Sequence, residues 1–166
     1  HLPLLWVECE DEEGRQTQAL AFNEAWVERD TGQTAWLQVS LDEQVRIDRL
    51  VADGALVSTA AGSSAYARAM GASPMPLNTP ALLLVGSNVL WPNNWRPAVL
   101  PLDSRLELRT LDPAKRPLKA FIDGVEQGRV SSLRARISRS ASVELAFLPD
   151  HNPVEKLARI QFPLEA

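Results

Sequence analysis

Residues 53–66 combine the side-chain types and the spacing that binding of a polar ligand requires. An Asp-Gly turn leads into a short apolar stretch, then a loop of Ser, Thr, Ala and Gly, and then an alanine-rich segment. Small side chains let a ligand approach the backbone, and N–H groups at the start of a helix donate to polar or anionic groups. The segment therefore predicts contacts to a nucleotide. The alternative is a plain strand-to-helix connection in which Ser63 or Ser64 caps the helix.

Two well-known motifs of similar composition are excluded in this segment. A phosphate-binding P-loop requires a lysine directly after its second glycine, and here Ser63 follows Gly62. A nucleophile elbow requires a glycine two residues after its serine, and Tyr66 occupies that position after Ser64. Residues 53–66 thus match neither motif.

The dipeptide Asn23-Glu24 is a second candidate for ligand binding. It interrupts an otherwise apolar stretch, so burial of the amide and the carboxylate is costly unless each finds a partner. Side chains placed in this way often bind the hydroxyl groups of a ligand. The alternative is that one of the two faces water, because alternation in a strand exposes every second residue.

The composition of the 166-residue chain narrows the class of protein. A net charge of −4, with the basic residues scattered, argues against a nucleic-acid-binding face, which needs clustered Lys and Arg. The single cysteine, Cys9, and the two histidines exclude an intrachain disulfide, a thiolate zinc cage and a His-rich metal site. The longest apolar run, residues 80–85, is too short to span a membrane. We expect a soluble, cytoplasmic protein.

The elements that must position these residues are mainly short strands. Apolar and polar residues alternate in 36–42, 45–48 and 105–109, as in half-buried strands. Residues 19–29 are also strand-like, and the turn at 31–33 predicts that they form a hairpin with 36–42. Asp123-Gly124 supplies the positive φ angles of a two-residue turn and predicts a hairpin between 118–122 and 125–130.

Helical patterns are few, because the 12 prolines and 8 glycines interrupt most windows. Residues 63–70 predict one short helix, and Asn152-Pro153 predicts the start of another, with Val154, Leu157 and Ala158 on one face. We therefore predict a mainly β, multi-stranded sandwich-like domain over 1–149 with two short helices. Residues 150–166 are predicted to pack as an appendage or toward a further domain that is absent from the chain.

The segment 53–66 resembles the signature of the NAD kinase family, which runs Asp-Gly, three apolar positions and Ser-Thr-Pro-Thr-Gly-Ser-Thr-Ala-Tyr. The coinciding positions are Asp53, Gly54, Ser58, Thr59, Gly62, Ser63, Ala65 and Tyr66. Three further pieces follow the order of the family: Asn23-Glu24 with Arg29, the string 96–101, and Ile122-Asp123-Gly124. The resemblance covers nearly the whole chain and implies the C-terminal, mainly β domain of such a kinase.

The resemblance implies a role for each matching position in binding NAD as substrate. Asn23 and Glu24 would hydrogen-bond the adenosine part, and Asp53 would receive the carboxamide at the nicotinamide end. Ser64, Ala65 and Tyr66 would line the adenine and ribose pocket. Carboxylates that accept from hydroxyl or amide groups give strong, directional recognition, which is consistent with these roles.

The family also implies components that this chain lacks. Its catalytic Gly-Gly-Asp-Gly motif belongs to a preceding α/β domain, and the chain contains no Gly-Gly pair. The complete enzyme would transfer a phosphoryl group from ATP or polyphosphate, with Mg²⁺, to the 2′-hydroxyl of NAD, and the family assembles as homo-oligomers. We expect no catalytic residue here, and no turnover by this chain alone.

Several positions depart from the family pattern and keep alternatives open. Ala60 and Ala61 replace Pro and Thr, Ala69 stands where serine is common, and the histidine of the stretch before Arg96 is replaced, with Trp91 nearby. These changes alter the volume and polarity of the pocket. One alternative is a non-catalytic nucleotide-sensing or interaction module of the same fold. The other is a relative of lipid kinases, against which the signature argues.

Overall fold

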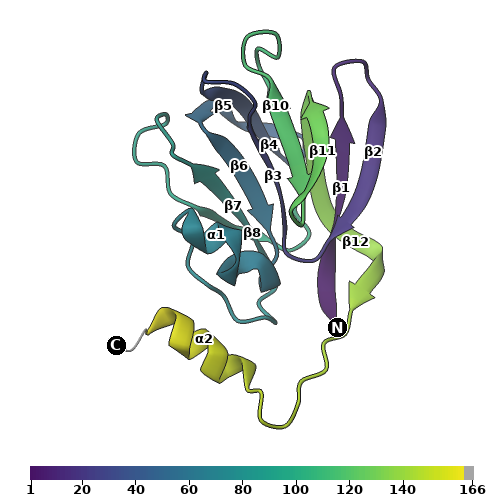
Figure 1. The fold of residues 1–166 in the computed structure, drawn as a ribbon, viewed down its shortest axis with the longest axis vertical. Coiled ribbons are helices and arrows are strands. Elements are labelled where there is room, and N and C mark those ends of the chain that lie inside the picture. Colours follow the sequence, from purple (N-terminus) through teal and green to yellow (C-terminus); the bar gives the residue numbers. More distant parts are fainter. Residues whose placement is uncertain (163–166) are drawn as a thin grey trace.

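The computed structural model describes residues 1–162 as two antiparallel six-stranded sheets packed face to face (Figure 1). Sheet A has the strand order β2-β1-β12-β9-β4-β5, and sheet B has the order β11-β10-β3-β6-β7-β8. The mainly β sandwich with two short helices is thus confirmed. The strands of sheet A are β1 (Leu2–Glu10), β2 (Gln16–Ala21), β4 (Ala35–Leu41), β5 (Gln44–Ala52), β9 (Leu106–Thr110) and β12 (Ser132–Val143). Those of sheet B are β3 (Glu24–Arg29), β6 (Gly54–Ser58), β7 (Ala81–Ser87), β8 (Ala98–Pro101), β10 (Leu118–Ile122) and β11 (Val125–Val130).

The core lies between the sheets and follows from alternation along each strand. Leu5 and Val7 of β1 and Leu37 of β4 face Val27 and Leu84 of sheet B in one apolar cluster. Strand β6 differs, because all five of its residues are buried. Its outer face is covered by helix α1 (Tyr66–Ala69), so its sequence is continuously apolar rather than alternating.

The predicted hairpin around Asp123-Gly124 is confirmed. Ile122 pairs with Val125, and the two turn residues have φ angles of 45° and 82°. The predicted strands at 36–42, 45–48 and 105–109 correspond to β4, β5 and β9. Alternation was sufficient to find these strands because each has one face on the core and one face in solvent.

The predicted hairpin between 19–29 and 36–42 is wrong. Residues 19–29 divide into β2 and β3, which belong to different sheets, and β4 pairs with β5 and β9 instead. The chain crosses between the sheets at Phe22 and Asn23. The polar dipeptide that seemed to interrupt a single strand therefore marks the end of one strand and the start of another.

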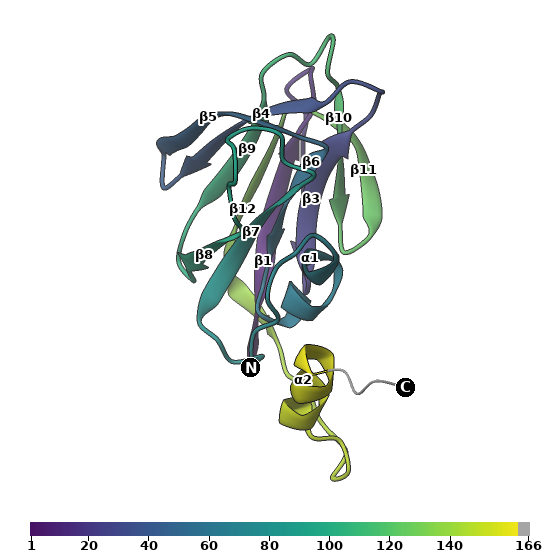
Figure 2. The same cartoon turned by 90° about the vertical axis from the view of Figure 1, so that its left-hand side faces the viewer.

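The helices are short and lie toward one end of the sandwich (Figure 2). A 3-10 turn, η1 (Ala61–Ser64), precedes α1, and no side chain caps either one, so the predicted serine cap is wrong. Helix α2 (Pro153–Gln161) begins as predicted, because Asn152 accepts a hydrogen bond from the N–H of Val154 at 2.9 Å. Among residues 1–162, no helix has the length and apolar character to cross a membrane.

Candidate functional site

The crossing between β2 and β3 is held by the carboxylate of Asp123. Its Oδ2 accepts the N–H of Phe22, and its Oδ1 accepts the N–H groups of Asn23 at 2.9 Å and Glu24 at 3.1 Å. The backbone N–H of Asp123 in turn donates to the carbonyl of Glu24 at 2.9 Å. The β10–β11 turn thereby fixes the backbone of the Asn23-Glu24 dipeptide.

The loop after β6 packs against the same crossing from the other side. The N–H of Thr59 donates to the carbonyl of Asn23 at 2.9 Å, and the Thr59 hydroxyl donates to the carbonyl of Phe22 at 2.7 Å. Gly62 approaches Asn23 so closely that a Cβ atom there would collide with its carbonyl oxygen. Only glycine fits this position, because the two segments of backbone are in contact.

Most polar side chains of residues 58–66, called here the signature loop, stabilise the loop itself. The Ser58 hydroxyl donates to the carbonyl of Thr59 at 2.8 Å. The Ser63 hydroxyl donates to the carbonyl of Ala60 at 2.6 Å and accepts the N–H of Met75 at 2.8 Å. These buried hydroxyls are therefore occupied by the protein, which leaves Ser64 and Tyr66 as the polar side chains of this loop that are at least partly exposed.

Glu24 is the buried acid of the site. Its residue is 6% exposed, and its Oε2 atom is buried with no hydrogen-bond partner among the described residues. Burial raises the pKa of the Glu24 carboxyl to about 7, and the nearby negative charge of Asp123 adds to the effect. A buried carboxyl oxygen without a partner is uncommon in a folded protein, and a ligand hydroxyl or amine would satisfy it.

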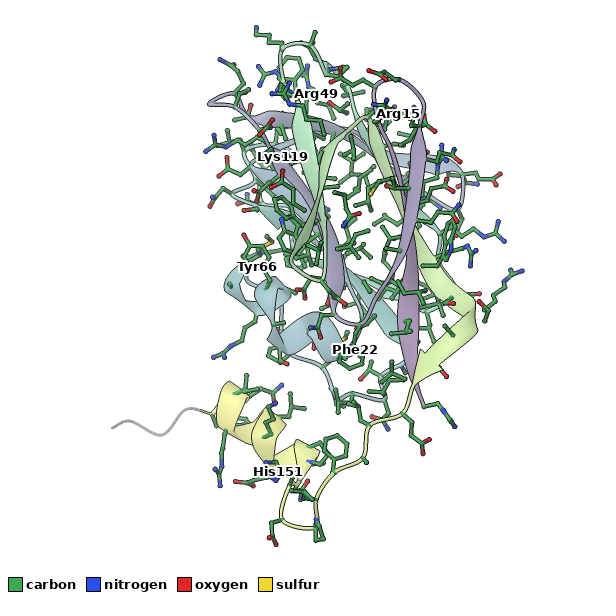
Figure 3. The ribbon with its side chains drawn as sticks, turned by 45° about the vertical axis from the view of Figure 1, so that its right-hand side comes forward. Arg15, Phe22, Arg49, Tyr66, Lys119 and His151 are labelled. Atoms are coloured by element: carbon green, nitrogen blue, oxygen red, sulfur yellow. The ribbon has the colours of Figure 1, made fainter. Side chains whose placement is uncertain are left out.

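An aromatic cluster lies beside this acid on the outer face of sheet B. Trp26, two residues after Glu24 on β3, stacks on Phe121 of β10 with ring centroids 4.8 Å apart. Tyr66 meets Trp26 edge to face at 5.1 Å and is 40% exposed. Figure 3 shows Tyr66 on this side of the molecule, with its ring at the surface. Because Trp26 and Phe121 support it, Tyr66 presents a fixed aromatic ring to solvent.

Asp53 lies at the opposite end of β6 from these residues. Gly54 pairs with Glu28, and Ser58 pairs with Glu24, so Asp53 is more than about 13 Å from Glu24 along the strand. Its carboxylate accepts from Asn88 Nδ2 and from Arg29 Nε, each at 2.7 Å. The hydrogen bond from Asn88 and the charge and hydrogen bond of Arg29 hold the pKa of Asp53 below its ordinary value, although partial burial opposes them.

The structure thus brings five of the six expected site residues to one end of sheet B and places Asp53 at the other end. The five are Asn23, Glu24, Ser64, Ala65 and Tyr66. Within the described part of the chain, no group of three or more His, Cys, Asp and Glu side chains is arranged to hold a metal ion. Surface hollows beside β12 and beside the β1–β2 turn are not lined by these residues.

Two features of the site were not expected from the sequence. Asp123 was assigned to a hairpin turn and to a string that matches the family order, but not to the site, although its carboxylate organises a dipeptide about a hundred residues away. Trp26 and Phe121 were not assigned to the site, because their proximity depends on the pairing of β3 with β10. The string Ile122-Asp123-Gly124 was a signal for the first feature, and no local pattern indicated the second.

Comparison with known proteins finds NAD kinases among the relatives of this chain. The NAD kinase of Xylella fastidiosa (strain Temecula1) is 37% identical over 154 residues, which are 93% of this chain and 60% of the relative. The NAD kinase of Xanthomonas campestris pv. campestris (strain 8004) is 37% identical over 162 residues, which are 98% of this chain and 63% of the relative. The chain therefore spans about three fifths of the length of these relatives. No family model matches it.

Solved structures show the same fold at lower identity. Yeast NADH kinase in complex with NADH superposes with a TM-score of 0.75 and 21% identity, covering 83% of this chain and 40% of that one. An NAD kinase from Archaeoglobus fulgidus in complex with ATP gives a TM-score of 0.65 and 20% identity, covering 82% of this chain and 51% of that one. The two-sheet sandwich is thus a fold that this chain shares with both kinases. The chain is thus similar to NAD kinases in sequence and to both of these kinases in fold.

Proposed function

We propose that this chain is the NAD-binding part of an NAD kinase-like phosphotransferase that converts NAD to NADP. The observation that carries the proposal is the buried Glu24 carboxyl, whose Oε2 has no partner among the described residues and lies beside the signature loop. A carboxylate in this position can accept hydrogen bonds from the hydroxyls of a ribose. The fixed ring of Tyr66 next to it offers a surface on which a base can stack.

The proposed assignment places the two ends of NAD at the two ends of β6. Asn23 and Glu24 bind the adenosine part, while Ser64, Ala65 and Tyr66 line the adenine and ribose pocket. Asp53 receives the nicotinamide carboxamide. Its carboxylate already accepts two hydrogen bonds and retains lone pairs for more. The distance between Asp53 and Glu24 fits a dinucleotide, whose two nucleosides are joined through a pyrophosphate.

The complete protein would need parts that this chain does not contain. Phosphoryl transfer requires metal-bridged phosphates and a positioned base. We propose that a preceding α/β domain with the Gly-Gly-Asp-Gly motif supplies them, using ATP or polyphosphate with Mg²⁺, in a homo-oligomeric cytoplasmic enzyme. The matched relatives are NAD kinases of greater length, and one solved relative holds NADH and another ATP.

We propose further that the C-terminal segment, 150–166, packs against that preceding domain. None of the residues of α2 is buried, and the apolar side chains of Val154 and Phe162 are 72% and 74% exposed. The helix contacts the rest of the chain through hydrogen bonds from Gln161 Nε2 to the carbonyl of Pro74 at 3.2 Å and from Arg68 Nη2 to the carbonyl of Ile160 at 3.4 Å. An apolar helix surface in water favours a packing partner. Residues 163–166 of this segment lie outside the described residues.

A calorimetric titration of the chain with NAD tests the binding site. Asp53→Ala and Tyr66→Ala are each expected to weaken NAD binding about tenfold or more, because each removes a direct contact at one end of the dinucleotide. Asp48→Ala, which removes an exposed carboxylate on β5, is the matched control and should bind as the unmodified chain does. Unchanged isotherms for both site variants would rule the site out.

The activity of the longer protein separates the proposal from its alternatives. Incubated with NAD, ATP and Mg²⁺, it should form NADP, measured by an enzyme that uses NADP alone. Binding of NAD without any NADP formation would instead establish a nucleotide-sensing module, which the alanines at positions 60, 61 and 69 favour. Failure to bind NAD together with retention of a lipid would support the lipid-kinase relative.

A further inference from the structure

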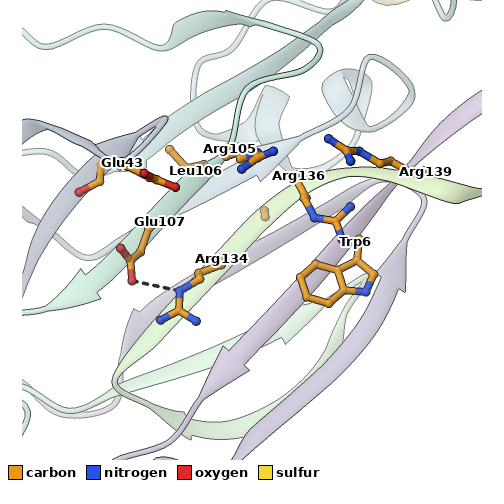
Figure 4. Close-up of a pocket in the computed structure, with 10 residues that line it drawn as sticks. Trp6, Glu43, Arg105, Leu106, Glu107, Arg134, Arg136 and Arg139 are labelled. Carbon is orange, nitrogen blue, oxygen red and sulfur yellow. Dashed lines mark hydrogen bonds and ion pairs between the residues drawn. The ribbon is translucent and has the colours of Figure 1, made fainter.

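The outer face of sheet A contains a hollow of about 470 Å³ on the side of the sandwich opposite to α1 (Figure 4). It lies over β1, β9 and β12, next to the turn between β4 and β5. Arginines outnumber acids among the charged residues that line it, which are Arg105, Arg134, Arg136, Arg139, Glu43 and Glu107. The chain as a whole carries a net charge of −4, whereas the residues that line this hollow carry a net positive charge.

Arg134 is the arginine of this group whose charge is compensated. Its Nη1 lies 2.7 Å from Glu8 Oε1, and its Nε lies 3.2 Å from Glu107 Oε1. These contacts form a row of alternating charges across the strands of sheet A, as is usual on a solvated sheet face. The positive charge of Arg134 is therefore balanced by Glu8 and Glu107, and this part of the hollow does not attract an anion.

The other three arginines have no carboxylate partner among residues 1–162. Neither Arg105 nor Arg139 makes a side-chain hydrogen bond within the described residues, whereas Arg136 donates from Nη1 to the carbonyl of Ile137 at 3.1 Å. The same three residues also line a second hollow of about 470 Å³ beside the first. They lie where the two hollows meet, and Figure 4 shows Arg105, directly before β9, and Arg139 of β12 extending toward the hollow.

Trp6 holds the guanidinium group of Arg136 in a fixed orientation. The guanidinium of Arg136 lies over the indole ring at 4.4 Å from its centroid. Stacking occupies the face of the guanidinium and holds its plane, so its N–H edge remains available for a ligand. A planar donor edge held in this way matches two oxygens of a phosphate group.

We propose that Arg105, Arg136 and Arg139 bind a ligand that carries linked phosphate groups. Three uncompensated guanidinium groups close together repel one another, and a multiply charged anion relieves that repulsion. Glu43 on the rim of the first hollow and Asp103 on the rim of the second reduce the positive charge but do not cancel three arginines. The ligand is either an inorganic oligophosphate or the phosphate chain of a nucleotide. The site lies apart from the proposed NAD site and does not depend on it.

Calorimetric titration of the chain with inorganic pyrophosphate and, separately, with ADP tests this site. We expect one ligand to bind per chain, and the Arg136→Gln, Arg139→Gln double variant to weaken binding about tenfold or more. Tighter binding of pyrophosphate than of ADP identifies the inorganic source, and the reverse identifies the nucleotide. Arg49→Gln is the matched control, since Arg49 also stacks on a tryptophan, at 4.9 Å from the ring of Trp36, but outside the hollow.

Two results would overturn the proposal. One is the absence of binding of either probe up to about 1 mM. The other is equal affinity in the double variant and the unmodified chain, with the circular dichroism of both showing the same fold. Pyrophosphate is also a part of NAD. If it bound at the proposed NAD site, its affinity would be the same in the double variant and in the unmodified chain, which is the second of these results.

Discussion

Asp123→Ala is expected to lower the free energy of unfolding by about 3 kcal/mol, the sum of three lost charge-assisted hydrogen bonds after allowance for solvent exposure. The substitution leaves the N–H groups of Phe22, Asn23 and Glu24 without their acceptor. It also places alanine at a φ of 45°, which adds a smaller backbone cost. Chemical denaturation measures the effect. NAD binding, titrated where the variant is fully folded, should weaken about tenfold or more, because Glu24 is no longer held in place.

Two further substitutions of Asp123 separate the cost of the lost hydrogen bonds from the backbone cost of the positive φ. Asp123→Asn keeps an amide oxygen for the N–H groups of Asn23 and Glu24 and tolerates the positive φ, so it should cost only about 1 kcal/mol. Asp123→Gly removes the carboxylate without the backbone cost and should fall between the two. If Asp123→Ala were within about 0.5 kcal/mol of the unmodified chain, the carboxylate would not hold the crossing between β2 and β3.

Glu24→Gln is expected to change stability and binding in opposite directions. Burial raises the pKa of Glu24 from 4.5 to about 7, so the folded state favours the protonated form. The stabilisation from this preference is complete below pH 4.5 and is lost as the pH rises through about 7. At pH 9 the neutral glutamine should therefore make the chain more stable than the unmodified one, by up to about 3 kcal/mol. At pH 4 the two should be nearly equal.

Binding of NAD should favour the ionised form of Glu24, whereas folding favours the protonated form. The ionised carboxylate is the stronger hydrogen-bond acceptor, so affinity for NAD should rise between pH 6 and pH 8 and Glu24→Gln should remove this rise. At pH 8 the variant should bind about tenfold more weakly. Glu12→Gln, at an exposed position in the β1–β2 turn, is the control for both measurements. If Glu24→Gln were less stable than the unmodified chain at pH 9, the result would contradict the proposal that burial of the ionised Glu24 carboxylate destabilises the folded state.

Local patterns in the sequence were sufficient to locate an element wherever one of its faces packs on the core and the other faces solvent. Alternation located β4, β5 and β9, and the Asp-Gly pair located the turn between β10 and β11. The start of α2 followed from Asn152 and Pro153, because capping depends on neighbouring residues only. For the same reason the mainly β class was predictable from many short alternating segments.

Pairing between distant segments was not predictable in the same way. Alternation reports which residues share a face but not which strand lies alongside, so 19–29 was interpreted as one strand of a hairpin rather than as β2 and β3 in separate sheets. Ser63 or Ser64 was predicted to cap a helix, whereas neither does so and the Ser63 hydroxyl joins Ala60 to Met75 across the loop. The positions of Trp26 and Phe121 beside Tyr66 likewise depend on the order of strands in sheet B.

The contact between Asp123 and the crossing at Phe22 also constrains how the molecule reaches its native state. The two positions are 101 residues apart in sequence, so bringing them together requires closure of a long loop. During synthesis, strand β3 leaves the ribosome well before the turn that fixes its first residues. The Asn23-Glu24 backbone therefore acquires its final conformation only after β10 and β11 have been made and β10 has paired with β3. The proposed binding site is thus one of the last parts of this sandwich to form, and a chain that ends before Asp123 lacks the group that orders it.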